Sequence, residues 1–182
     1  IAKAVAVAPE LRVLDATAGL GTDSFVLAAY GCKVVALESS PVVYALLRDG
    51  LERAQEAVYA GEITHSARIA RRISLLFADA VSYMRELSLL RGVADERLPQ
   101  VVYLDPMYPY VKKSALPKKE MQVFRRLLGH TQNIDELLEA ARSCALERVV
   151  VKRPLEAKPC GQPQHVFEGK TARYDFYLPF RA

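Results

Sequence analysis

The stretch VLDATAGLGTDSF, residues 13–25, decides the fold that this sequence predicts. An apolar run ends at Asp15, a loop with Gly19 and Gly21 follows, and a helical pattern begins near Thr22. Glycines let a loop backbone approach a ligand closely, and the first turn of a helix leaves N–H groups without helical partners. The stretch is therefore typical of a strand, a ligand-binding loop and a helix in an α/β domain.

Short aliphatic runs alternate with helical patterns along the rest of the chain. Strands are expected at residues 11–15, 33–38, 73–78, 101–105 and 148–152. Helices are expected at residues 24–30, 41–59, 61–72, 80–90 and 134–145, the last after a start at Asn133 and Glu136 that resembles a capping box. Nearly continuous apolar strands are typical of a parallel sheet that helices cover on both faces. Two further runs, at residues 164–168 and 173–179, predict a terminal antiparallel hairpin.

Together these runs predict a doubly wound, Rossmann-like α/β fold, with a mostly parallel sheet, helices on both faces and the hairpin at its C-terminal end. The length of 182 residues, with 51% hydrophobic and 25% charged residues, favours one domain over residues 1–182. No apolar run approaches the roughly 20 residues of a membrane helix, and no secretion signal opens the chain, so a cytoplasmic location is expected. The three cysteines and three histidines are scattered without metal-ligand spacing, so no metal site is expected.

The charges around the glycine loop favour a cationic nucleoside as cofactor over a dinucleotide. A dinucleotide-binding loop would carry a third glycine at position 24, where this chain has Ser24. Asp15 and Asp23 would repel a pyrophosphate, whereas they suit the sulfonium and ammonium groups of S-adenosylmethionine (SAM). We therefore expect SAM to bind beside Gly19 and Gly21; the alternative is a glycine turn that serves only the path of the chain.

Two more acids end expected strands and fit an adenosine ligand. Glu38 ends the second strand, where an acid can accept both ribose hydroxyls. Asp79 ends the third strand, where it could accept the adenine amino group or cap the following helix, and the two roles are compatible.

The run DPMYP, residues 105–109, ends the fourth expected strand and suits methylation of an amino group on a base. Such an amine is a poor nucleophile because its lone pair is delocalised into the ring, so it must be held in line with the methyl group while its hydrogens are accepted. The Asp105 carboxylate and the Pro106 carbonyl can accept these hydrogens, and Tyr108 can stack on the base. A proline-rich turn with a core tyrosine is the alternative, which the acid at a buried strand end disfavours.

A basic segment follows this run. Residues 111–126 carry six basic residues and one acidic residue, a net charge of +5, whereas the whole chain has +4. A basic surface beside a base-binding loop suits a polyanion, and a solvated helix face is the alternative. We expect four lysines of this segment to contact phosphates: Lys112, Lys113, Lys118 and Lys119.

These stretches resemble class I SAM-dependent methyltransferases, and more closely the RsmJ family of bacterial small-subunit ribosomal RNA guanine-N2 methyltransferases. The segments that carry the resemblance are VLDATAGLGTDSFVLAAYGC, LESSPVVYALLRDGL, VVYLDPMYP with KKSALPKKEM, and RVVVKRP. The resemblance implies a class I methyltransferase fold and methylation of a guanine near the 3′ end of 16S ribosomal RNA. The partner would be this RNA or the small ribosomal subunit. It also implies cofactor contacts at Thr22, Asp23, Glu38, Ser39, Asp79, Ala80 and Asp105.

The chain departs from the family in two ways. Met107 stands where the commoner DPPY clamp has proline, and the resemblance leads us to expect an N-terminal segment of the full-length protein that this sequence does not include. Two other classes of function remain open. One is an amino methyltransferase acting on DNA adenine or on protein glutamine, and the other is a non-catalytic RNA-binding module with a vestigial cofactor pocket. The basic segment favours nucleic acid without separating RNA from DNA, and Asp105 with Tyr108 disfavours a non-catalytic module. The oligomeric state is not encoded in these patterns.

Overall fold

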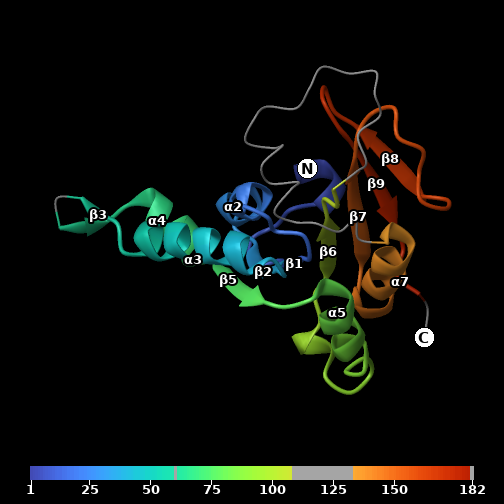
Figure 1. Cartoon of the computed structure of the whole chain (residues 1–182), viewed down its shortest axis with the longest axis horizontal. Helices are drawn as coiled ribbons and strands as arrows, with labels where there is room; N and C mark the ends of the chain where they lie inside the picture. Colours follow the sequence, from blue (N-terminus) through green and yellow to red (C-terminus); the bar gives the residue numbers. More distant parts are fainter. Residues whose placement is uncertain (60, 108–132, 181–182) are drawn as a thin grey trace.

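The computed structural model describes residues 1–59, 61–107 and 133–180, and its centre is a seven-stranded sheet of order β5-β2-β1-β6-β7-β9-β8 (Figure 1). The first five strands in this order are parallel, and β9 runs antiparallel to both β7 and β8. The strands are β1 (Arg12–Asp15), β2 (Lys33–Glu38), β5 (Ile73–Phe77), β6 (Val101–Leu104), β7 (Arg148–Arg153), β8 (His165–Glu168) and β9 (Arg173–Tyr177). The predicted parallel sheet with a terminal antiparallel hairpin is confirmed.

The strand order reverses at β1, and this fixes where a ligand can bind. The chain goes from β1 outward through β2 to β5 on one side, and it then returns to β6 on the other side of β1. The loops that follow β1 and β6 leave the sheet in opposite directions from this point, so a crevice opens between them. Asp15 pairs in register with Tyr103, which places the ends of the two strands side by side.

Helices cover both faces of the sheet, as Figure 1 shows. One hydrophobic core joins the sheet to α2, α3 and α4, and a second joins it to α5 and α7. The helices are α1 (Ala2–Val5), α2 (Thr22–Ala29), α3 (Pro41–Gln55), α4 (His65–Ala70), α5 (Ala80–Ser88) and α7 (Ile134–Cys144), with a 3₁₀ turn, η1, at Asp95–Arg97. None of the helices in the described ranges is long and apolar enough to cross a bilayer.

The start predicted for α7 is confirmed in position and differs in detail. The Asn133 side chain caps the helix by accepting from the Asp135 backbone N–H at 3.1 Å. Glu136, the expected capping-box partner, instead forms an ion pair with Arg85 of α5 at 2.9 Å. The acid at this position therefore joins two helices on the same face of the sheet.

The stretch after α3 differs from its prediction. The helix expected over residues 41–59 ends at Gln55, and Val58–Tyr59 forms a short strand, β3, that pairs with β4 (Glu62–Ile63). Val58 and Tyr59 are exposed, so these two residues extend the apolar spacing of α3 in the sequence but are not buried in the fold. Gly61 has a φ of 82°, which interrupts helical backbone, and the predicted helix over 61–72 is shortened to α4. This hairpin projects away from the sheet (Figure 1).

Candidate functional site

A cavity of about 570 Å³ opens at the carboxyl ends of β1, β2, β5 and β6. Gly19 in the loop after β1 and Asp105 in the loop after β6 both line it, so the two runs that the sequence singled out meet in one space. The predicted site residues that line the cavity are Asp15, Gly19, Thr22, Asp23, Glu38, Ser39, Asp79, Ala80, Asp105 and Pro106.

Asp15 shapes the glycine loop from inside the protein. Its side chain is almost fully buried, with one oxygen accepting from the Thr17 N–H at 3.2 Å and the other from the Ser24 hydroxyl at 2.5 Å. Burial raises the pKa of the Asp15 carboxyl to about 7, against these hydrogen bonds, which lower it. Asp15 therefore ties β1 to its loop and to α2 and has no oxygen left without a protein donor.

The two glycines of the loop serve different purposes. Gly19 lines the cavity, and its N–H donates to Glu38 Oε2 at 3.1 Å. Gly21 lies outside the cavity lining, has a φ of 76°, and would place a Cβ only 2.6 Å from Leu47 Cδ1. The positive φ favours glycine for the turn into α2, and a larger residue would require the end of the Leu47 side chain to shift. Gly19 also has a positive φ, of 54°, so the chain path favours glycine at both positions, and Gly19 in addition lines the cavity.

Glu38 and Asp79 sit at the ends of neighbouring strands on the same side of the cavity. Glu38 is 7% exposed and accepts from Gly19 N–H and, at 2.7 Å, from Ser40 N–H. Burial raises the pKa of its carboxyl, and hydrogen bonds from backbone N–H groups, that of Ser40 first, oppose this rise. Asp79 caps α5 by accepting from the Ser82 N–H at 2.9 Å, so its predicted capping role is confirmed.

The side of the cavity that Asp105 lines, called the acceptor side below, holds a network of charged and hydroxyl groups. The Lys152 ammonium contacts one oxygen of Asp23 and one oxygen of Asp105, each at 2.8 Å. The Tyr103 hydroxyl donates to the same Asp23 oxygen at 2.6 Å, and the Asp105 N–H donates to Thr17 Oγ1 at 2.6 Å. The network joins α2, β6, β7 and the loop after β1, so it fixes the position of the Asp105 carboxylate.

Burial and neighbouring charges decide which of these groups are ionised. Burial raises the pKa of Asp105, and the Lys152 ammonium opposes that rise. Burial lowers the pKa of Lys152, but the attraction of Asp105 and Asp23 outweighs it and raises the pKa above its usual range. Burial beside these carboxylates also raises the pKa of Tyr103, which keeps its hydroxyl a donor. Lys152 is therefore a cation at neutral pH and cannot serve as a base.

Three members of this network, Lys152, Tyr103 and Thr17, were not predicted as site residues. A signal for Lys152 was present, because it follows the apolar run of β7 and the ends of parallel strands share one edge of a sheet. Tyr103 and Thr17 carried no such signal, since one looks like a core aromatic and the other like an ordinary loop residue. The predictions for Tyr108, Lys112, Lys113, Lys118 and Lys119 lie outside the described residues.

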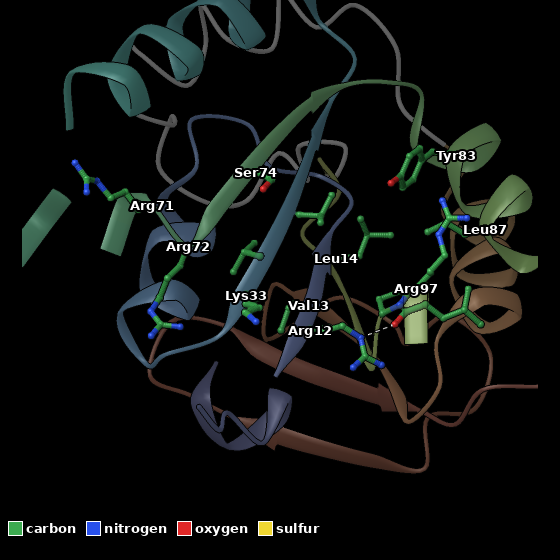
Figure 2. A pocket seen from close by; sticks show the side chains of 14 residues that line it. Arg12, Val13, Leu14, Lys33, Arg71, Arg72, Ser74, Tyr83, Leu87 and Arg97 are labelled. Atoms are coloured by element: carbon green, nitrogen blue, oxygen red, sulfur yellow. Dashed lines mark hydrogen bonds between the residues drawn. The ribbon is translucent and has the colours of Figure 1, made fainter. Parts of the chain in front are cut away.

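A second cavity, of about 400 Å³, lies at the opposite ends of the strands and contains none of the predicted site residues. Figure 2 shows Leu14 in its floor, Tyr83 and Leu87 of α5 on one side, and Arg97 beside them. Arg12 is held there by a hydrogen bond from its Nε to the Leu98 carbonyl at 3.0 Å, drawn as a dashed line. The polar groups of this cavity come from the starts of β1, β2 and β5, from the end of α4, from α5 and from η1, and none comes from the glycine loop.

Comparisons with known proteins agree on one family. The family model described as "Putative SAM-dependent methyltransferase" matches residues 1–179. Ribosomal RNA small subunit methyltransferase J from Pseudomonas aeruginosa (strain UCBPP-PA14) is 49% identical over 181 residues, which cover 97% of this chain and 64% of that protein. The protein of the same name from Buchnera aphidicola (subsp. Acyrthosiphon pisum, strain Tuc7) is 42% identical over 170 residues, covering 92% and 64%.

Solved structures give the same result for the fold. The crystal structure of a SAM-dependent methyltransferase from Neisseria gonorrhoeae matches with a TM-score of 0.76 and 42% identity, and the match covers 100% of this chain and 66% of that one. An rRNA methyltransferase from Streptomyces viridochromogenes, at 16% identity and a TM-score of 0.54, shares the fold and covers 96% of this chain and 79% of its own. The chain spans about two thirds of the length of the curated relatives described above.

Proposed function

The chain belongs to the ribosomal RNA small subunit methyltransferase J family of SAM-dependent methyltransferases, and from this membership we propose its activity. It transfers the methyl group of SAM to the exocyclic N2 of a guanine near the 3′ end of 16S ribosomal RNA. The single observation that carries this proposal is the shared cavity of Gly19 and Asp105. Residues 1–182 act as one methyltransferase domain, and a ribosomal substrate implies that the protein works in the cytoplasm.

The residues of the cavity fit SAM. Its volume of about 570 Å³ is within the usual range for small-ligand sites. Glu38, with its carboxylate held by two backbone N–H groups, suits the ribose hydroxyls, and Asp79 with Ala80 suits the adenine. Asp23, at the first turn of α2, suits the positive charges of the methionine part, and Thr22 and Ser39 complete the predicted contacts.

SAM supplies the methyl group, and the chain's own residues handle the amine. The Asp105 carboxylate and the Pro106 carbonyl accept the two hydrogens of the guanine amine, which orients its nitrogen toward the methyl group. As the N–C bond forms and the sulfur–methyl bond breaks, the amine must lose one proton. Asp105 is suited to receive that proton because burial raises the pKa of its carboxyl.

The RNA side of the proposal rests on the basic segment of residues 111–126. Lys112, Lys113, Lys118 and Lys119 contact phosphates that flank the target, and Tyr108 stacks on the flipped base. Stacking of this kind contributes roughly 1 to 3 kcal/mol, which offsets the few kcal/mol that base flipping costs.

Methyl transfer from labelled SAM tests the proposal. The substrates are small ribosomal subunits and 16S RNA from a strain that lacks the modification, and the labelled nucleosides are then identified by chromatography and mass spectrometry. N2-methylguanosine is the expected product. Label in N6-methyladenosine or in protein would move the chain to the other amino methyltransferases. SAM binding without transfer to any of these substrates would support the non-catalytic module.

A further inference from the structure

One lysine joins the cofactor side of the cavity to its acceptor side. Lys152 lies in β7, with 27% of its side chain exposed, and its ammonium is 2.8 Å from both Asp23 and Asp105. We propose that Lys152 is a positioning residue of the methyl transfer, which holds the Asp105 carboxylate ionised and aimed at the incoming amine. This inference rests on the proposed function and adds a residue to it.

The setting of Asp105 explains why it requires a cation. It follows β6, all four residues of which are buried, and its own side chain is 38% exposed, so it has lost part of its solvation, which favours the neutral acid. A protonated carboxyl would donate on one of its oxygens, which would oppose an amine that must also donate. The Lys152 ammonium offsets the loss of solvation, as an opposite charge within about 4–6 Å does.

Other ionisable groups around Lys152 and Asp105 increase the need of the Asp105 carboxylate for a neighbouring cation. Among the described residues, Lys152 is the cationic side chain that contacts Asp105, whereas the neighbouring Asp23 carboxylate disfavours the ionised form of Asp105. The titratable side chains that surround Asp105 and Lys152 in the described residues are Asp15 on β1, Asp23 on α2, Tyr103 on β6 and Tyr174 on β9. Without Lys152, Asp23 and Asp105 would face each other as two like charges.

The hydrogen bonds also set the direction of the Asp105 carboxylate. Lys152 occupies Oδ2, and the Asp105 N–H is fixed by Thr17. Within the described ranges Oδ1 has no hydrogen-bond partner, and Asp105 lines the cavity, so this oxygen is left for the substrate amine. Tyr103 fixes Asp23, and Asp23 in turn fixes the lysine. A residue held at its backbone N–H and at one carboxylate oxygen loses little freedom when the amine arrives.

Kinetics of four variants test the proposal: Lys152→Met, Lys152→Gln, Lys152→Arg and the control Lys170→Met. Methionine keeps the length of the side chain, glutamine keeps polar contacts, and both remove the charge. Lys170 is exposed in the turn between β8 and β9, so its substitution removes one positive charge away from the cavity. The measurements are kcat and KM for RNA from pH 5 to 9.5, with thermal unfolding to identify folded variants.

In the uncharged variants the acid limb of the kcat profile should move up by about 1 to 3 pH units, because Asp105 loses its stabilising cation. At pH 7 kcat should fall by roughly 10- to 100-fold, KM for RNA should change by less than about threefold, and activity should recover toward pH 9. Lys152→Arg should keep most of the wild-type profile, and Lys170→Met all of it.

Two results would overturn the positioning role. One is a folded Lys152→Met or Lys152→Gln variant whose pH profile matches that of the wild type. The other is an equal loss of activity at every pH in all three Lys152 variants, as expected of a residue that only supports the structure. Failure of the proposed function looks different, because the wild-type protein itself would then transfer no methyl group.

Discussion

The two ends of the same parallel strands carry two cavities of different character. At the carboxyl ends, acids and one lysine form a bonded network around about 570 Å³ of space. At the amino ends, about 400 Å³ is lined by aliphatic side chains of the sheet, with Arg12, Lys33 and Arg97 around them (Figure 2). The cavity at the amino ends of the strands thus has an apolar floor, whereas the groups able to act on a substrate converge at the carboxyl ends.

The backbone explains this separation of charge. Helices α2, α3 and α5 begin beside the carboxyl ends of the strands, and their N-termini favour negative charge. At the other end, Arg72 donates to the Gly31 carbonyl just beyond α2, and Arg71 ends α4. Arg71 and Arg72 therefore complement helix C-termini, which gives this part of the basic lining of the second cavity a structural cause. The comparison shows that the candidate site differs from the second cavity in the hydrogen bonds and ion pairs that join its charged groups.

Removal of the Asp105 carboxylate from the carboxyl-end cavity is expected to have the largest effect on activity. Asp105→Ala should lower kcat by about 1000-fold, because the amine loses the group that accepts its hydrogen in the transition state. SAM affinity, measured by calorimetry, and the circular dichroism spectrum should stay close to wild type. Unchanged turnover would remove Asp105 from the mechanism and leave the carboxyl-end cavity without its proposed chemistry.

The buried acid of the glycine loop should make stability depend on pH. The folded-state pKa of Asp15 is about 7, above the value of 3.8 for an unperturbed carboxyl, so its stabilising contribution is complete below pH 4 and is lost as pH rises to 7. Asp15→Asn removes this loss and should gain on the order of 3 kcal/mol relative to wild type between pH 4 and 8.

Chemical denaturation across this pH range measures the gain. Asp49→Asn is the matched control, because Asp49 is exposed on α3 in an ion pair with Arg53, and its difference from wild type should be nearly flat. A flat difference for Asp15→Asn as well would show that the carboxyl-end cavity does not keep this acid protonated.

Glu38 tests the cofactor side of the same cavity. Glu38→Ala removes the acceptor for the Gly19 and Ser40 N–H groups and the proposed acceptor for the ribose, so SAM should bind about 10- to 100-fold more weakly. Glu38→Gln keeps one acceptor oxygen and should lose less. Isothermal titration calorimetry measures both, and wild-type affinity in Glu38→Ala would place the ribose elsewhere.

Charge removal in the basic segment and, separately, at the rim of the second cavity is expected to give the smallest effects. Lys112→Ala with Lys113→Ala should weaken RNA binding and reduce the slope of log affinity against log salt by about two. Lys33→Ala with Arg97→Ala removes the same charge from the exposed rim of the second cavity and should leave the slope unchanged. Equal slopes for the two pairs would remove Lys112 and Lys113 from the proposed RNA contact.

The strands along the chain and the strand ends at which polar residues lie were predictable, because each depends on a local run of sequence. Asp15, Glu38, Asp79 and Asp105 each follow an apolar run, and parallel strands bring such ends to one edge. The hairpin after α3 was not predictable from spacing, since Val58 continues an apolar stripe that the fold does not bury. The separate purposes of Gly19 and Gly21 also required the position of Leu47 in α3.

The sequence by itself determined the fold class, the loop after β1 and the acids of the cavity, because strand and helix periodicity and glycine conformation act over a few residues. Only the tertiary structure decided how those acids are bonded. Lys152 is 129 residues from Asp23 and 47 from Asp105, and Tyr103 is 80 residues from Asp23. Which acid receives the cation depends on strand register and side-chain packing, and these exist only after the whole sheet has formed.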